Sequence, residues 1–171
     1  GAGAVPYGEC MAAELHPDVA VLAPLLGTWE GSGSGEYPTI DDFAYVESIT
    51  FAHVGKPFIA YTQRTTHPET GAPMHAETGY LRVPRPGSIE IVMAQPTGLA
   101  EIYEGAVVGG DAPLVIDVRS TSINSTSSAK EVTVTERTIS VTGDHLHYTF
   151  RMAAVDQPLQ HHLSATLHRV G

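Results

Sequence analysis

Hydrophobic and polar residues alternate along most of the chain from about residue 45 onward, and this two-residue period is typical of β-strands with one buried face. The alternation is clearest at residues 145–152. The apolar positions of this segment are Leu146, Tyr148, Phe150 and Met152, and the polar positions are His145, His147, Thr149 and Arg151. We therefore expect the first set to line the interior of the protein and the second set to face solvent.

Short alternating segments recur along the chain and are separated by turn signals. The predicted strands cover residues 45–51, 58–62, 79–83, 89–93, 100–108, 114–119, 131–141, 145–153 and 162–170. Because the segments between them are short, neighbouring strands are expected to pair as antiparallel hairpins in an all-β sandwich or barrel. Residues 120–128 are poor in apolar side chains and are predicted to form a mobile loop.

One short helix is predicted before the first strand. Residues 16–18, His-Pro-Asp, are typical of a helix start, and Gly27 is typical of a helix end. The apolar stripe between them consists of Val19, Leu22, Leu25 and Leu26. Residues 1–15 are interpreted as an N-terminal tail and residues 16–171 as a single domain.

The only Trp of the chain stands among glycines, in the segment that begins at Gly27 and continues through Trp29, Gly31 and Gly33. Glycine permits strands to bend and backbones to approach closely, and a tryptophan ring can plug the end of a barrel. This segment favours a small β-barrel over a sandwich. An enclosed interior of this kind is suited to a ligand.

Charge and cysteine content limit the classes of binding partner and the cellular compartment that we expect for this protein. The chain has 19 Asp and Glu against 9 Lys and Arg, for a net charge of -10, which disfavours nucleic acid and anionic membranes as partners. It has a single cysteine, Cys10, so no disulfide can form within the chain. Together with the lack of a secretory signal pattern, this leads us to expect a cytoplasmic protein.

Nine histidines are the most suggestive chemical feature, because histidine is a common metal and haem ligand. Most of them fall in turns or on polar strand faces and are expected to be surface residues. His75, His161 and His162 are candidates for cofactor binding, although a hydrogen-bonded structural role is the alternative for each. His161 and His162 are adjacent, so on a regular strand they would point to opposite faces and could not share one ion.

The ordered motifs of the chain resemble those of the nitrobindin family. The GxWxGxG signature of that family matches residues 27–33, although lipocalins and fatty-acid carriers share its GxW core. Further segments agree in order along the chain, at residues 37–40, 51–57, 74–80, 129–132 and 157–163. The resemblance covers nearly the whole domain and is closest to the actinobacterial branch.

This resemblance implies a fold, a cofactor and an activity. The fold is a closed antiparallel up-and-down β-barrel of about ten strands, similar to calycins, which encloses one haem b. The implied activity is the isomerisation of peroxynitrite to nitrate by the ferric form, and the iron is also expected to bind nitric oxide. The resemblance leaves a homodimer open. A non-catalytic haem or nitric oxide sensor or carrier, and a fatty-acid-binding-like carrier of apolar ligands, are the alternative functions.

The resemblance also implies site residues. His162 corresponds to the single axial ligand of the haem iron, and His75 corresponds to the distal histidine, which can donate a hydrogen bond to a bound ligand. Thr39 and Lys130 match positions that contact the haem or its propionates. We expect an apolar wall around the haem that includes Leu146, Tyr148, Phe150, Met152, Ile91 and Met93.

Alternation and resemblance disagree about the last strand. If that strand is regular, His161 shares a face with Leu163 and points inward, whereas the resemblance selects His162. We expect His162 to point inward, because the turn at Pro158 favours an irregular strand start. Near the other end of the same strand, Arg169 is expected to stack on Trp29 and close the barrel floor.

Overall fold

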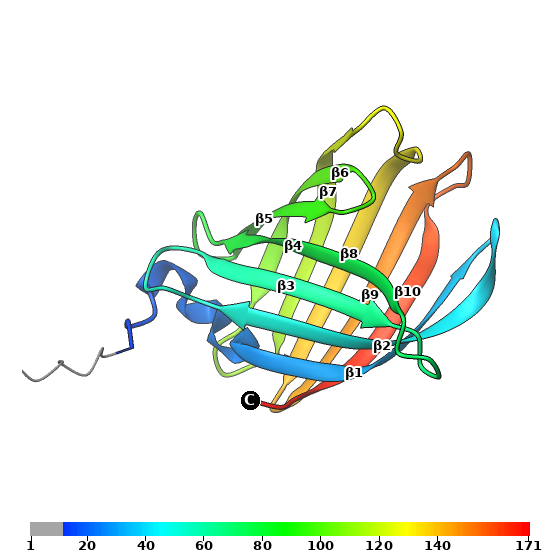
Figure 1. Ribbon diagram of the computed structural model, residues 1–171. Helices are drawn as coiled ribbons and strands as arrows, with labels where there is room; N and C mark the ends of the chain where they lie inside the picture. Colours follow the sequence, from blue (N-terminus) through cyan, green and yellow to red (C-terminus); the bar gives the residue numbers. More distant parts are fainter. Residues whose placement is uncertain (1–11) are drawn as a thin grey trace, which may run out of the picture.

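The chain folds into a ten-stranded antiparallel barrel in a computed structural model that describes residues 12–171 (Figure 1). Residues 1–11, which include Cys10 and most of the predicted tail, lie outside the described part. The strands are β1 (Gly27–Tyr37), β2 (Ile40–Ala52), β3 (Ile59–Thr66), β4 (Pro73–Arg82), β5 (Ser88–Gln95), β6 (Leu99–Val108), β7 (Leu114–Ser125), β8 (Val132–Thr142), β9 (His145–Ala154) and β10 (Gln160–Arg169). Each strand pairs with its neighbours in sequence, and β1 also pairs with β10, so the barrel is closed.

The short N-terminal helix lies across one end of the barrel, opposite the β1–β2 and β9–β10 hairpins (Figure 1). This helix, η1 (Pro17–Leu25), is a 3₁₀ helix capped by His16, whose Nδ1 accepts a hydrogen bond from the backbone N–H of Asp18. The predicted apolar stripe packs into the core through Val19, Leu22 and Leu25, all fully buried. We refer to this end of the barrel as the closed end and to the other as the hairpin end. No helix within residues 12–171 is long and apolar enough to cross a membrane.

Trp29 closes the barrel at η1, as its glycine-rich surroundings predict. The ring is fully buried, and its Nε1 donates a hydrogen bond of 2.7 Å to the carbonyl oxygen of Leu25. The guanidinium of Arg169 lies 4.2 Å from the ring centroid, which confirms the predicted stacking. Arg169 also donates to the carbonyl oxygens of Leu26 and Pro24, so it ties η1 to the last strand.

The glycines of the same motif permit the close approach of β1 to its neighbours. Gly27 has a φ of 116°, a conformation that other residues rarely adopt. A Cβ at Gly31 would overlap the carbonyl oxygen of Thr166 on β10, and a Cβ at Gly33 would overlap the ring of Tyr45 on β2. The motif is therefore a packing requirement of this barrel wall.

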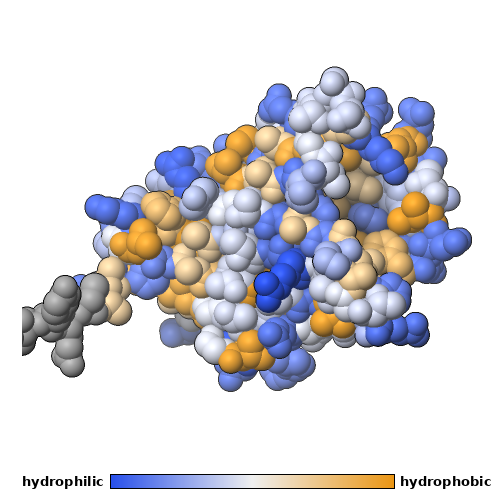
Figure 2. Space-filling model, in the orientation of Figure 1, coloured by the Kyte–Doolittle hydropathy of each residue, from blue (hydrophilic) through white to orange (hydrophobic). Residues whose placement is uncertain are grey.

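The structure corrects the first part of the loop predicted at residues 120–128, whereas residues 126–128 do lie in the connection between β7 and β8. Strand β7 continues to Ser125 and pairs with β6 over this stretch, with Leu99 opposite Ser125. Backbone hydrogen bonds to β6 maintain the strand even though its side chains are largely exposed. The polar composition of this segment therefore did not predict its secondary structure. The outer surface carries interspersed hydrophilic and hydrophobic residues on the face shown in Figure 2.

Candidate functional site

A cavity of about 640 Å³ occupies the barrel and reaches the hairpin end. The residues that line it near that end include Thr97, between β5 and β6, and residues 128–130, between β7 and β8. The predicted inward residues Leu146, Tyr148, Phe150 and Met152 all line the cavity. Its volume lies within the range of small-molecule and cofactor sites.

His162 points into this cavity because β10 contains a bulge. His161 pairs with Arg151 and Leu163 pairs with Phe150, which leaves His162 as the extra residue. As a result the adjacent residues His162 and Leu163 both line the cavity, which a regular strand does not permit. The predicted irregularity at the start of this strand is confirmed.

His161 lies on the other side of the barrel wall. It borders a separate surface recess together with Ser34, Glu36 and Asp42. The two adjacent histidines therefore face different compartments, and only His162 is directed at the barrel interior.

The imidazole of His162 is held in one tautomer. Its Nδ1 lies 2.9 Å from the backbone carbonyl oxygen of Glu36, and because a carbonyl can only accept, Nδ1 carries the proton and donates it. The second nitrogen, Nε2, consequently has a free lone pair. Burial is the main cause that lowers the pKa of His162, and the nearby His161 and His75 lower it further, against the hydrogen bond to Glu36, which raises it. The ring is thus kept neutral, as a metal ligand must be.

Aromatic side chains from three strands surround this ring. The ring centroid of His162 lies 5.2 Å from that of Tyr37, 6.2 Å from that of Phe43 and 5.9 Å from that of Phe150. Contacts of this kind restrict the imidazole to one orientation. His162 is therefore a preorganised, neutral and cavity-directed nitrogen donor.

Of the other predicted site residues, His75 and Lys130 line the same cavity, whereas Thr39 does not. His75, on β4, lines the cavity, and its Nε2 lies 3.8 Å from Oε2 of Glu77. Lys130 lines the rim and is exposed to solvent. Thr39 lies in the exposed turn between β1 and β2 and does not line the cavity.

The expected apolar wall requires a correction. Ile91 and Met93 point inward but pack within the hydrophobic core, and neither lines the cavity. Alternation gives the side of a strand to which a residue points, whereas its depth along the barrel depends on neighbouring strands. Polar residues occupy much of the wall in their place.

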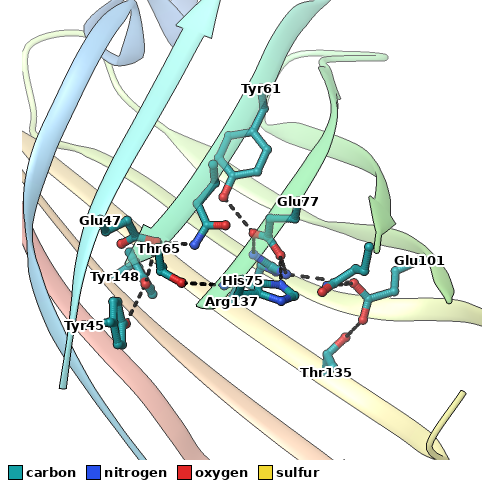
Figure 3. A network of polar contacts seen from close by, with 12 residues as sticks. Tyr45, Glu47, Tyr61, Thr65, His75, Glu77, Glu101, Thr135, Arg137 and Tyr148 are labelled. Carbon is teal, nitrogen blue, oxygen red and sulfur yellow. Dashed lines mark hydrogen bonds and ion pairs between the residues drawn. The ribbon is translucent and has the colours of Figure 1, made fainter. Parts of the chain in front are cut away.

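A buried network of polar residues, which the sequence patterns did not predict, lies in the cavity wall (Figure 3). Its centre is the ion pair between Glu77 on β4 and Arg137 on β8, joined by two hydrogen bonds of 2.6 and 3.0 Å. Tyr61 donates a further hydrogen bond of 2.7 Å to Glu77. Burial favours a raised pKa for Glu77, but the charge of Arg137 and the hydrogen bonds from His75, Arg137 and Tyr61 hold it well below its usual range.

A second carboxyl, Glu101 on β6, extends the network. It accepts hydrogen bonds from Gln95, Tyr103 and Thr135, and Arg137 lies 3.9 Å away. The Nε of Arg137 donates to the hydroxyl of Tyr103. The guanidinium of Arg137 therefore forms its ion pairs and hydrogen bonds with other residues inside the barrel.

A third carboxyl, Glu47 on β2, belongs to a separate branch. It accepts hydrogen bonds from Gln63 at 2.5 Å and from the hydroxyl of Tyr148 at 3.1 Å. Tyr148 and Tyr45 are joined through their hydroxyls at 2.7 Å. None of the ion pairs within residues 12–171 includes Glu47.

The alternation of residues along the strands already places members of this network at inward-facing positions. Glu47 stands two residues from Tyr45 and Ile49, and Arg137 stands two residues from Ile139, so each shares the inward parity of apolar neighbours. A charged residue at such a position is buried only when it is paired. The sequence alone does not show which strands supply the partners.

Fold and site together define a closed β-barrel that presents one oriented histidine to an internal ligand cavity. Residues 18–169 match the model of the THAP4-like, heme-binding beta-barrel domain. The chain therefore belongs to this family, and the resemblance to nitrobindins is confirmed.

Relatives with known names and structures agree with this assignment. The chain is 57% identical to Peroxynitrite isomerase 1 of Mycolicibacterium paratuberculosis and 54% identical to Peroxynitrite isomerase 2 of Mycobacterium marinum, in each case over 93% of this chain and 99% of the relative. The crystal structure of Rv2717c from M. tuberculosis superposes with a TM-score of 0.90 at 48% identity, covering 92% of this chain and 100% of that one. The predicted ten-stranded barrel is thus confirmed.

Proposed function

We propose that this chain binds one haem b in the barrel cavity and that its ferric form isomerises peroxynitrite to nitrate. Membership of a heme-binding barrel family and the names of the relatives support this function. The observation that carries the proposal for this chain is the state of His162. Its Nδ1–H donates to the carbonyl of Glu36, so its unprotonated Nε2 is available in the cavity.

The residues present fit a haem group. A histidine that binds a metal almost always donates its other N–H to a carbonyl, a carboxylate or water, which fixes the ring and increases its basicity. His162 meets this requirement without any rearrangement. Phe150, Tyr148 and Met152 offer surface for the macrocycle, and the ammonium of Lys130 at the rim is suited to a propionate.

The reaction places limited demands on the protein. Peroxynitrite and nitrate have the same atoms and the same charge, so the conversion needs no external reductant and no net proton. When bound, haem supplies the iron centre at which the rearrangement takes place. The tasks of the chain are then to orient the imidazole of His162 through the carbonyl of Glu36, to admit a small anion and to confine it within the barrel. His75 lines the same cavity, and in this proposal it would donate a hydrogen bond to a bound ligand.

The barrel offers little to a fatty acid. Carriers of that class usually capture a carboxylate with inward arginine and tyrosine residues, and here Arg137, Tyr61 and Tyr103 point inward. Glu77, however, already occupies the guanidinium through two hydrogen bonds. The chain thus supplies its own carboxylate to this group, which favours a haem site over a fatty-acid site.

Haem titration of the full chain tests the cofactor site. The Soret band should saturate at one haem per chain in the wild type, and His162→Ala should lose this binding. His161→Ala is the matched control, because it removes the adjacent histidine from the opposite side of the wall, and it should bind haem normally. Loss of binding in His161→Ala with retention in His162→Ala would overturn the assignment.

Rapid mixing of the ferric haem-loaded chain with peroxynitrite tests the activity. Nitrate should form faster than in buffer alone. Binding of nitric oxide, which we also expect, is measured with the same preparation. A rate equal to that in buffer, together with intact binding of haem and nitric oxide, would show that the chain is a sensor or carrier and not an isomerase.

A further inference from the structure

The two oxygens of the Glu47 carboxyl have very different surroundings. Oε2 accepts both available hydrogen bonds, from Gln63 and from Tyr148. Oε1 is buried, has no hydrogen-bond partner and belongs to a side chain that lines the cavity. The Glu47 residue is only 2% exposed, so bulk solvent does not satisfy Oε1. An ionised carboxylate in this position would leave one oxygen uncompensated.

Comparison with Glu77 shows which of these carboxyls is suited to carry a proton. Glu77 uses both oxygens, which accept from the guanidinium of Arg137. Glu47 has two neutral donors on one oxygen and none on the other. Two carboxyls whose environments differ in this way titrate in different pH ranges, so that below about pH 7 one is protonated while the other is ionised.

The surroundings of Glu47 raise its pKa on balance, although single groups act in opposite directions. The pKa of Glu47 is raised to about 7, with burial as the largest cause, and the negative charge of Glu77 on β4 also raises it. The hydrogen bonds from Gln63 on β3 and Tyr148 on β9, and the charge of Arg137 on β8, lower it by less. The hydroxyl of Tyr45, on the same strand, bonds to Tyr148 and has a pKa raised by burial, so it stays neutral.

We propose that Glu47 carries a proton on Oε1 and that this O–H is a hydrogen-bond donor which the cavity offers to a small anion. Glu47 would then be a specificity-determining residue for an anionic substrate. This inference rests on the proposed function, in which the substrate is the peroxynitrite anion. A neutral acid donates to an anion, whereas an ionised Glu47 repels it inside a poorly screened cavity. Anion entry is therefore coupled to one proton on this side chain.

Azide, a small anion that binds ferric haem, is the probe for the first measurement. Its dissociation constant is measured by the Soret band of the haem-loaded chain from about pH 6 to about pH 9 in the wild type and in Glu47→Gln. The amide of the variant is neutral at every pH and retains an N–H donor. The ratio of wild-type to variant dissociation constants should rise by up to about tenfold for each pH unit above 7.

The matched control is Glu104→Gln, which removes the same formal charge from an exposed position on β6. The ratio of wild type to this control should not change with pH. A constant ratio for Glu47→Gln, or an equal rise for Glu104→Gln, would overturn the proposed role of Glu47. The proposed function would still hold in that case, provided that haem binding and isomerase activity are intact.

A second measurement needs no haem. The ¹³C signal of the Glu47 side-chain carboxyl is identified in the full chain by its absence in Glu47→Gln, and it is titrated with and without nitrate at constant ionic strength. Its midpoint should lie near 7, and nitrate should raise it further, because a ligand that prefers the protonated form stabilises it by linkage. A midpoint near the ordinary value of about 4.3, or one that nitrate leaves unchanged, would overturn the proposal. A chain that takes up no haem would overturn the proposed function, and this titration would still decide the role of Glu47.

Discussion

Arg137 and Glu77 face each other across the barrel interior with two parallel hydrogen bonds of 2.6 and 3.0 Å, although 60 residues separate them in the sequence. Each comes from a strand that places both polar and apolar residues inward, with His75 and Leu81 on β4 and Thr135 and Val141 on β8. The pair joins β4 to β8, which are not neighbours in the sheet. It therefore connects opposite parts of the wall through the cavity.

Removing one member of this pair should destabilise the fold strongly. Arg137→Met leaves Glu77 as a buried carboxylate without a cation, which typically costs about 3–5 kcal/mol in free energy of unfolding. The double variant Arg137→Met/Glu77→Gln should recover a large part of this loss, because no buried charge remains unpaired. Chemical denaturation of the three proteins measures both values.

The exposed pair of Arg119 and Glu136, at 3.1 Å, provides the comparison. Arg119→Ala should cost no more than about 1 kcal/mol, because solvent screens this ion pair. Equal losses for Arg137→Met and Arg119→Ala would contradict a structural role for the buried pair.

The protonation of Glu47 predicts a pH dependence of stability. In the folded state its pKa is raised from 4.5 to about 7, so its contribution to stability is fully present below 4.5. As the pH rises to about 7 the unfolded chain ionises while the folded chain keeps its proton, and this contribution is lost. Relative to Glu47→Gln, the wild type should lose up to about 3 kcal/mol over this interval and then remain level.

Denaturant titrations at several pH values measure this difference. Glu77 has the opposite sign, since its stabilising effect is lost as the pH falls, but it is unchanged between the two proteins and cancels. A parallel course of both stability curves would show that folding does not shift the pKa of Glu47.

Arg169 should contribute to stability without affecting haem. Its guanidinium stacks on Trp29 and donates to two backbone carbonyls at the closed end. Arg169→Ala removes a cation–π contact of about 0.5–2 kcal/mol, so the thermal midpoint should fall. The haem spectrum should stay unchanged, because His162 lies near the hairpin end. Loss of haem at unchanged stability would contradict this interpretation.

Gly31 should tolerate no larger residue. The Cβ of Gly31→Ala would overlap backbone atoms of Thr166, and β1 would have to move away from β10 at an expected cost of about 1–3 kcal/mol. Ser32→Ala, at an exposed neighbouring position, is the control and should be nearly neutral. Thermal unfolding of both variants measures the difference, and equal midpoints would show that β1 can shift freely.

Local patterns predicted the strands and the closed end because both depend on short-range features. The face to which Leu146, Tyr148 and Phe150 point follows from alternation within one strand. Trp29 between glycines marks a position where a ring must be enclosed. These features do not require knowledge of which strands become neighbours.

The polar network could not be predicted in the same way because it depends on register across the barrel. Glu77 and Arg137 meet only after the three intervening strands, β5 to β7, are aligned, and a slip of one residue would turn either outward. The extension of β7 through Ser125 has the same origin, since pairing with β6 determines it rather than composition. Alternation within single strands therefore predicts an apolar wall where the structure has paired charges.

The bulge at His162 makes the site depend on the number of residues as well as on their identity. Beyond Leu163 the strand alternates regularly, so its inward face is set by the rest of the barrel. Deleting His161 would remove the extra residue, restore regular alternation and turn the remaining histidine toward solvent. A one-codon deletion could thus abolish the cavity histidine while every other inward side chain of β10 kept its place.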